Sequence, residues 1–295
     1  MKLQKWIGII LVFCFLFTAG IPGGSVTAAP SEQSAGREGG PVSVPRTPAG
    51  DPADLAAAIT ENPAWITGSS FQVSPDAAAS AVFTAPLTFF PSGSDADYAV
   101  LTTGDVSSIP TVGAFASTNW GTGPVRGDTD LDVTIWVIDL DVPVGADCLS
   151  LNFQFLSEEF PQFVGSSFND AFIAELDTSD WTTSGSTITA PHNFAFDTNG
   201  NVISINSVVG VAAVNGAGSA FNDDDGGEGG ATFLLTARTP ITPGAHALFL
   251  SIFDQGDRIY DSAVFLDNLE IYAAGFGCEA GIVGNELNFL PLMIK

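Results

Sequence analysis

Basic residues are scarce in this chain of 295 residues: 8 Lys and Arg stand against 33 Asp and Glu, for a formal net charge of −25. So few cations argue against binding to nucleic acid, whose phosphates are contacted by Lys and Arg, and against docking on anionic lipid. The charge balance fits an extracellular protein whose excess negative charge is partly neutralised by bound cations.

Histidine is almost absent, since the chain holds only His192 and His246. Two histidines without acidic partners nearby in the sequence argue against a His-based zinc site and against a Ser-His-Asp triad. The Gly-x-Ser-x-Gly pattern of many hydrolases is also missing. We therefore expect a protein that is not an enzyme.

The N-terminus is typical of a secretory signal peptide. Lys2 and Lys5 precede an apolar core, Trp6–Phe17, and small residues at Val26 and Ala28 suit signal peptidase. The alternative, an uncleaved membrane anchor, needs about 20 apolar residues. We predict a signal peptide over 1–28, cleavage after Ala28, a Pro-, Gly- and Ser-rich disordered linker over 29–48, and secretion or display at the cell surface.

Cysteine is rare as well, and only Cys148 and Cys278 remain once the signal peptide is removed. Two cysteines in an exported protein most simply form one disulfide. Two buried free thiols are the alternative. A bridge here would close a long loop and stabilise the fold by roughly 3–5 kcal/mol in the chain-entropy model.

What the chain has in abundance is Phe, Gly and Pro, in short apolar segments separated by turn residues. This favours an all-β, antiparallel β-sandwich, jelly-roll-like, over 49–278, with one short helix at Asp51–Ile59 and a tail over 279–295. The expected strands are Phe71–Val73, Ala81–Phe83, Tyr98–Leu101, Val133–Ile138, Leu149–Phe155, Ala171–Leu176, Asn193–Phe196, Val202–Ile205, Thr232–Leu235, His246–Ile252 and Ser262–Ile271.

Two stretches, 153–170 and 253–268, each begin as a strand and break into a loop dense in carboxylates. Hard oxygen ligands supplied by loops are what Ca²⁺ prefers, with six to eight at about 2.3–2.6 Å. The alternative is a solvated acidic edge. The candidate ligands are Glu158, Glu159, Asn169, Asp170, Asp254, Asp257, Asp261 and Asp267.

Asp261 and Asp267 flank a single predicted strand, so a rise of about 3.3 Å per residue separates them. We expect them to serve two different sites, or one of them to be structural. A second candidate metal site is the alternating set Asp128, Asp130 and Asp132, whose like charges would repel unless a cation bridges them.

The neighbouring acids Glu158 and Glu159 also allow a glycan hydrolase that uses paired carboxylates. A carbohydrate-binding module would instead present an aromatic platform. The candidates for such a platform are Tyr98, Trp120, Trp136 and Trp181.

Several motifs, read together, resemble the choice-of-anchor L domain family. They are YAVLTTGD at 98–105, GDTDLD at 127–132, SEEFPQFVG at 157–165, FNDAF at 168–172, Pro243-Gly244, and DRIYDSAVFL at 257–266. The likeness spans roughly Asp51–Ile271 and implies a bacterial domain that is secreted or displayed on the surface, with little established biochemistry. The sequence shows no sorting tail, so the resemblance does not extend to an anchor.

These features together predict a secreted or cell-surface β-sandwich, stabilised by calcium, that acts as an interaction or adhesion module. Its expected partner is a surface glycan or an extracellular protein, and no membrane span is expected in the mature chain. A carbohydrate-binding module, a glycan hydrolase and a self-assembling coat or filament subunit remain open alternatives.

Overall fold

The computed structural model describes residues 50–207, 213–214, 216, 218–222, 229–275 and 277–283. The predicted signal peptide, the linker and most of the predicted tail lie outside these residues. No helix within the described ranges is long and apolar enough to cross a bilayer.

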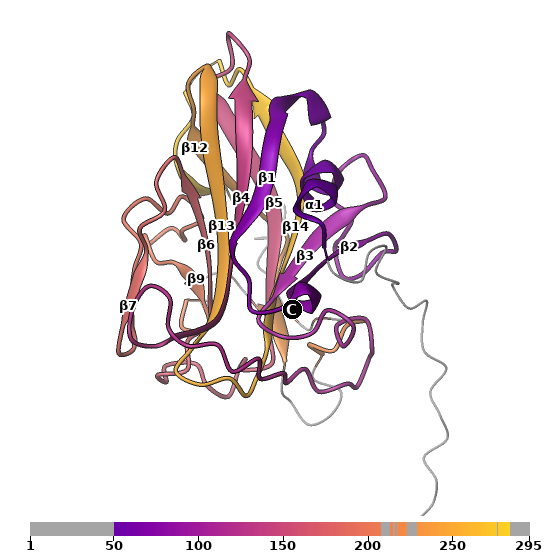
Figure 1. Ribbon diagram of the computed structural model, residues 1–295, viewed down its shortest axis with the longest axis vertical. Helices are drawn as coiled ribbons and strands as arrows, with labels where there is room; N and C mark the ends of the chain where they lie inside the picture. The colour runs from indigo at the N-terminus through magenta and orange to yellow at the C-terminus, as the bar shows by residue number, and fades with distance from the viewer. Residues whose placement is uncertain are drawn as a thin grey trace, which may run out of the picture. The chain divides into compact units, whose positions relative to one another are not determined.

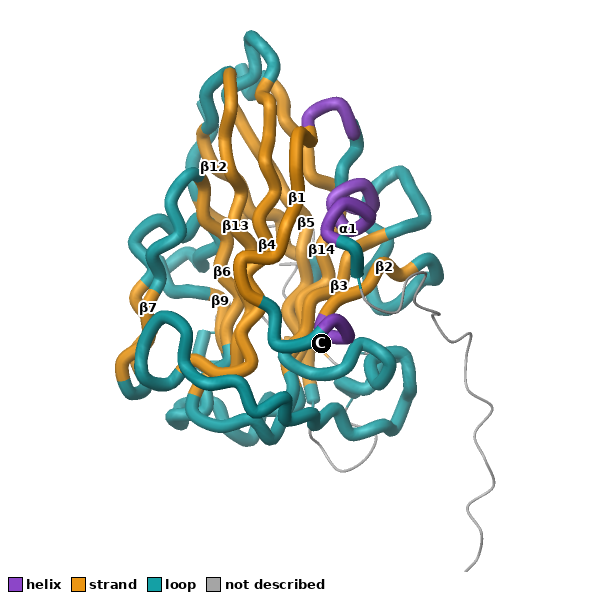
Figure 2. The backbone as a smooth tube through the Cα atoms, viewed as in Figure 1, coloured by secondary structure: helices purple, strands orange, loops and turns teal. Residues whose placement is uncertain are grey.

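Two antiparallel sheets pack face to face, which confirms the predicted all-β sandwich (Figures 1 and 2). The first is five-stranded, with strands ordered β1 (Ile66–Val73), β4 (Asp130–Val142), β13 (Gly244–Gln255), β6 (Ala171–Leu176) and β9 (Ile203–Ser204). In the second, eight strands pair through β10 (Ala213–Val214), β11 (Gly230–Thr232), β5 (Cys148–Ser157), β14 (Ser262–Tyr272), β3 (Tyr98–Thr102) and β2 (Ser80–Phe83), with β12 (Leu235–Pro240) beside β5 and β15 (Gly281–Val283) beside β12.

Helices are few and short: α1 (Pro52–Ile59) and the 3-10 turns Pro63–Trp65 and Ala77–Ala79. Helix α1 begins where the sequence predicts, because the Asp51 carboxylate accepts a hydrogen bond from Ala53 N at 2.9 Å and Pro52 occupies the first turn. Its Leu55 and Ile59 are buried.

The long strands β4, β5, β6, β12, β13 and β14 alternate between the two sheets along the chain. The main core therefore lies between the sheets. It joins Trp136 of β4 and Phe172 of β6 with Phe153 and Phe155 of β5 and Val264 of β14. Burying apolar surface of this extent is the dominant favourable contribution to folding.

Both sheets also carry apolar groups on their outer faces, and loops cover them. Beyond β3 and β14, the side chains of Phe90, Tyr98 and Phe265 form a second cluster. Beyond β4 and β13, Trp181 stacks on Phe253 at 4.3 Å between ring centroids. The small hairpin of β7 (Thr182–Ser184) and β8 (Thr187–Thr189) covers part of this outer cluster, since Ile188 packs against it.

The sequence-based boundaries need three corrections. Asn193–Phe196 makes only isolated bridges, and Thr232–Leu235 is split between β11 and β12. The sheet continues past residue 278, because β15 pairs with β12. That strand was missed because three residues are too few for an alternating pattern to stand out.

The predicted disulfide is present between Cys148 and Cys278, with 5.5 Å between their Cα atoms. It joins the start of β5 to the chain that follows β14.

Candidate functional site

Strand ends from both sheets gather at one end of the sandwich. β5 and β13 finish there, and β4, β6 and β14 begin there, because neighbouring strands run antiparallel. The loop between β5 and β6 and the loop between β13 and β14 each cross from one sheet to the other. Asn169 N donates to Gln255 O at 3.2 Å and Glu158 N donates to Asp261 O at 3.1 Å, so the two acidic loops touch.

Asp170 lies where the two loops meet and is buried. One carboxylate oxygen accepts a hydrogen bond from Gln255 N at 3.0 Å, and the other accepts one from the Ser262 hydroxyl at 2.6 Å. Burial raises the pKa of Asp170 to about 7, while the Ser262 and Gln255 hydrogen bonds lower it in part. This carboxylate therefore ties β6 to β13 in its own sheet and to β14 in the other.

Asp254 is the least satisfied group of the site. It follows a register irregularity in the pairing of β13 with β4, is 1 % exposed, and neither of its carboxylate oxygens has a hydrogen-bond partner among the described residues. Burial raises the pKa of Asp254 well above its ordinary value, and the charge of Asp170 raises it further. The Thr103 hydroxyl lowers the pKa of Asp254 in part, and a side-chain hydrogen bond from Asp254, which requires a proton on that carboxyl, lowers the pKa of Asp170. Asp254 therefore lacks a donor partner only in its ionised form.

Glu159 and Asp261 complete the inner group. Burial raises the pKa of Glu159 to about 10, with the charges of Asp170 and Asp257 adding to the rise. Burial likewise raises the pKa of Asp261 to about 7, against the lowering effect of hydrogen bonds from Thr118. Gly104 makes room for Asp261, since a Cβ there would come within 1.8 Å of a carboxylate oxygen. We call Glu159, Asp170, Asp254 and Asp261 the inner carboxylates.

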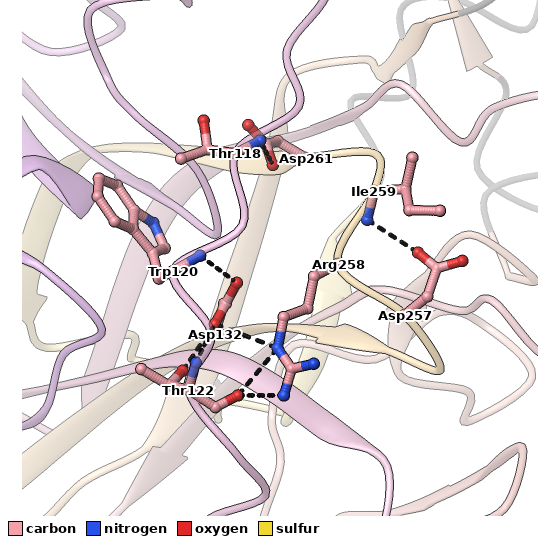
Figure 3. A network of polar contacts seen from close by, with 8 residues as sticks. All are labelled: Thr118, Trp120, Thr122, Asp132, Asp257, Arg258, Ile259 and Asp261. Carbon is pink, nitrogen blue, oxygen red and sulfur yellow. Dashed lines mark hydrogen bonds and ion pairs between the residues drawn. The ribbon is translucent and has the colours of Figure 1, made fainter.

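An extended segment, residues 114–126, crosses this end of the sandwich, and we call it the strap. At its C-terminal end, the consecutive Val125 N and Arg126 N both donate to Asp130. From residue 116 to residue 122, alternate backbone N–H groups donate to carboxylates, as the N–H groups of a strand would donate to a partner strand. The bonds are Ala116 N to Glu158 (3.1 Å), Thr118 N to Asp261 (2.8 Å), and Trp120 N and Thr122 N to Asp132 (3.1 and 3.0 Å). Figure 3 shows Thr118, Trp120 and Thr122 with their acidic partners.

Besides its own Arg126, the strap is accompanied by a second cation, Arg258 of the β13–β14 loop. The Arg258 guanidinium donates to Thr122 O and lies 3.6 Å from the Asp132 carboxylate (Figure 3). It faces the strap side of the site, and no ion pair within the described ranges joins a Lys or Arg to an inner carboxylate. Four buried acids consequently share one region without a matching positive charge.

As they stand, the acids do not form a ready metal cage. No three His, Cys, Asp or Glu side chains of the described residues are grouped closely enough to hold a metal ion. A cation at this point would require the inner side chains to turn toward it.

One predicted ligand, Asp267, lies away from the inner carboxylates, and two near them have hydrogen-bond partners of their own. Asp267 sits opposite Asn152 in β14, and its carboxylate accepts hydrogen bonds from Ser92 N and Gly93 N at 2.6 and 2.8 Å. This separation agrees with the expectation, from the strand rise, that Asp261 and Asp267 do not serve one site. Asn169 Oδ1 accepts from Asn206 N at 2.8 Å, and Asp257 accepts from Ile259 N at 2.9 Å, so each has a local role.

The second predicted metal site is not assembled. Asp128 accepts from Gly185 N at 2.9 Å, Asp130 from Val125 N at 2.6 Å, and Asp132 from the strap. Strict alternation fails because Asp132 has φ of 44°, in the left-handed region. Their shared role is to bind loop N–H groups.

The predicted aromatic platform is wrong for three of its four members, because Tyr98, Trp136 and Trp181 are at most 1 % exposed. Trp136 Nε1 donates to the Ser69 hydroxyl at 2.8 Å and Trp181 Nε1 to the Ser251 hydroxyl at 3.0 Å, so their polar atoms are satisfied inside. Trp120 is half-buried on the strap.

A different aromatic group lies on the converging loops. Phe115 of the strap contacts Tyr260, Tyr260 contacts Phe163, and Phe163 contacts Phe168, with ring centroids 5.0, 5.4 and 5.5 Å apart. Phe115 is 45 % exposed. We call these four the rim aromatics. In the sequence, Phe163, Phe168 and Tyr260 stand among the acids of the two loops, whereas Phe115 lies outside both stretches.

Comparison with known proteins adds little at the level of individual relatives. No curated protein matches the sequence. A solved structure, the enzymatically active domain of bacteriophage CBA120 tailspike protein 4, shares 12 % identity over 69 % of this chain and 19 % of its own, with a TM-score of 0.22. A likeness this weak bears on neither fold nor function.

The family comparison is clear. Residues 52–270, from the first residue of α1 to within β14, match the choice-of-anchor L domain. The match covers both sheets, the acidic loops and the strap. The chain therefore belongs to the choice-of-anchor L domain family and is a surface-associated module.

Proposed function

We propose that this protein is an exported, non-catalytic interaction module whose loop-bearing end is held together by a calcium ion. The rim aromatics, carried by the same loops, would offer a contact surface to an extracellular protein or a surface glycan. The observation that carries the proposal is Asp254, a buried carboxylate with both oxygens unpartnered beside three other acids.

The chemistry of the donors favours calcium over softer metals. Every side chain in the inner group offers oxygen, and the chain as a whole has a net charge of −25. Calcium accepts carboxylates and backbone carbonyls in flexible geometry, whereas zinc prefers nitrogen and sulfur. The inner carboxylates would supply the charged ligands, and bound calcium would offset both the burial and the repulsion by Asp170 that raise the pKa of Asp254.

Protons could relieve the same repulsion. With pKa values of about 7 for Asp170 and Asp261 and about 10 for Glu159, part of the group would be uncharged at neutral pH in the absence of a cation. Neutralisation by calcium and neutralisation by protons differ in one respect. Calcium binding must displace those protons, whereas a cluster neutralised by protons alone has a stability that does not depend on calcium.

Burial supports a non-catalytic role. A general acid must come within hydrogen-bond distance of its substrate, and Glu159, Asp170 and Asp261 are at most 2 % exposed. Glu158 already accepts the Ala116 N–H of the strap. A paired-carboxylate hydrolase would need this end of the molecule to open.

The test is a thermal melt of the purified domain with calcium and with EGTA, with magnesium as the control cation. Saturating calcium at 100 times its Kd stabilises the fold by about 2.7 kcal/mol, so we expect a clear rise in Tm. Asp254→Asn should abolish the rise caused by calcium. Asp267→Asn is the matched control, since it too is a buried aspartate with a raised pKa but lies outside the site. An identical melt with calcium and with EGTA, or a full calcium response in Asp254→Asn, would rule the site out.

A further inference from the structure

A groove runs between the β7–β8 hairpin and the segment 193–207, and Asn169 of the acidic β5–β6 loop also lines it. Its volume is about 470 Å³, within the range that small-molecule sites occupy. One wall carries Ser186, Thr187 and Ile188 of the hairpin, and the other includes Phe196 and Val202.

The lining contains no charged residue. This is unusual for a chain with 33 acidic residues, and it contrasts with a second cavity, of about 740 Å³, whose lining includes Asp54, Asp95 and Asp97. An ionic ligand in the groove would find no counter-charge there. A purely apolar ligand would leave the amides and hydroxyls of the lining unpaired, which is costly.

Part of the lining is already fixed by hydrogen bonds. Asn193 Oδ1 accepts from Ala174 N and Ala195 N, both at 3.0 Å, and Asn206 Nδ2 donates to Ser166 O at 3.1 Å. Ser204 N donates to the Ser207 hydroxyl at 2.8 Å. The groove therefore has a preformed wall, which lowers the entropy cost of binding.

Other polar groups of the lining remain available. In the part of the chain that the structure describes, the hydroxyls of Ser186 and Thr187 and the Asn169 side-chain amide nitrogen make no hydrogen bond, although Asn169 Oδ1 does. These donors lie in the same lining as the apolar side chains of Phe196, Ile188 and Val202. Hydroxyl and amide groups beside an apolar surface match a molecule with a ring of hydroxyls around a hydrocarbon face.

We infer that this groove is a binding site for a neutral saccharide. Sugar hydroxyls would bond to Ser186, Thr187 and the Asn169 amide, and the C–H face of a ring would pack on Phe196. The inference goes beyond the proposed function, because it names a ligand class at a site that includes none of the inner carboxylates.

The experiment is isothermal titration calorimetry of the purified domain, in calcium throughout, with cellobiose, maltose and chitobiose as neutral probes. A galacturonate dimer and a glucosamine dimer are the anionic and cationic comparisons. Ser186→Trp fills the groove from an exposed turn, and Thr189→Trp is the matched control, since Thr189 is exposed on the same hairpin but outside the lining.

We expect at least one neutral probe to bind, about tenfold or more weaker binding in Ser186→Trp, and unchanged binding in Thr189→Trp. The inference is overturned if no neutral probe binds at ~10 mM, if a charged dimer binds better, or if Ser186→Trp binds as the wild type does. A domain that binds sugar but melts identically with and without calcium would refute the metal proposal alone, so the two failures are distinguishable.

Discussion

The two ends of the sandwich are closed by different chemistry. At one end, the Cys148–Cys278 disulfide joins segments 130 residues apart, and Asp147 N donates to Tyr272 O at 3.0 Å beside it. At the other end, the chain is held by hydrogen bonds to carboxylates, with Asp170 linking β13 to β14 and Asp132 holding the strap. One closure is covalent, and the other depends on the charge of buried acids.

The two ends of the sandwich should therefore differ in how their stability depends on pH and on divalent ions. The Cys148–Cys278 disulfide carries no charge, so the bond responds neither to pH nor to divalent ions. Buried carboxylates respond to both, because their charge is costly unless a proton or a cation neutralises it. The loops that carry the rim aromatics belong to the responsive end.

Breaking the covalent end should have the largest effect. In the chain-entropy model, a loop of this length contributes about 4–5 kcal/mol, so Cys278→Ser should lower the free energy of unfolding by about that much. Chemical denaturation measures it. The increase in Tm caused by calcium should survive in this variant, and its loss would mean that the two ends are coupled.

The charged end should respond to pH when calcium is removed. Asp170 and Asp261 have pKa values of about 7 in the folded state, against 3.8 as the ordinary value, so folding takes up protons. Their contribution to the free energy of unfolding is fully present below about pH 3.8 and is lost as the pH rises through about 7. A tenfold change in the dissociation constant of an acid on folding corresponds to about 1.4 kcal/mol. The pKa of Asp197 is lowered by folding, so its contribution to stability is lost as the pH falls, but only below about pH 3.8.

In EGTA, the domain should therefore be more stable at pH 5 than at pH 8, and calcium should remove most of that difference. Urea denaturation at the two pH values checks this. Asp254→Asn should flatten the dependence, since it removes one of the repelling charges. Greater stability at pH 8 than at pH 5 in EGTA would contradict the assignment of buried, proton-binding acids.

Loosening the strap should have a smaller effect. Asp132→Ala leaves Trp120 N and Thr122 N without their acceptor, which costs about 1–3 kcal/mol for a buried unsatisfied group. Asp128→Ala is the control, because Asp128 is exposed and bonds only to the β7–β8 hairpin. Equal losses in both variants, measured by denaturation, would show that the strap is not held by its carboxylates.

The smallest expected effect concerns the rim aromatics. An aromatic pair contributes about 0.5–1.5 kcal/mol beyond the area it buries, so a double-mutant cycle of Phe115→Ala and Tyr260→Ala should give a coupling energy in that range. A value of zero would mean that the strap and the β13–β14 loop are held together by the acids alone.

The architecture could be predicted from the sequence because strand signals are local. Short apolar segments separated by turn residues define a sandwich, and antiparallel pairing then brings the loops after Phe155 and Ile252 to one end. The acids of those loops were found for the same reason. The strand rise separated Asp267 from Asp261, but the sequence does not mark Asp267 as the partner of the distant Ser92 and Gly93 amides.

Other features lay beyond sequence reasoning because they depend on contacts between distant segments. Nothing near Tyr98 or Trp181 in the chain reveals that further loops cover the outer faces of the sheets. The strap has no apolar alternation, and its hydrogen-bond acceptors come from residues up to 143 positions away, as in Thr118 and Asp261. The groove likewise joins the hairpin to the segment 193–207, in which regular strand structure is limited to the two residues of β9.

The hydrogen-bond pattern of the strap has a consequence for the exchange of its backbone amides. Its even-numbered amides at 116, 118, 120 and 122 donate to carboxylates, while within the described residues those of Ser117, Asn119 and Gly121 donate to none. Deuterium should therefore enter every second amide at once and leave the others for last. The alternation in exchange rates should disappear when the hydrogen bonds from the strap to the carboxylates break. Amide exchange therefore reports, residue by residue, whether the strap is bound.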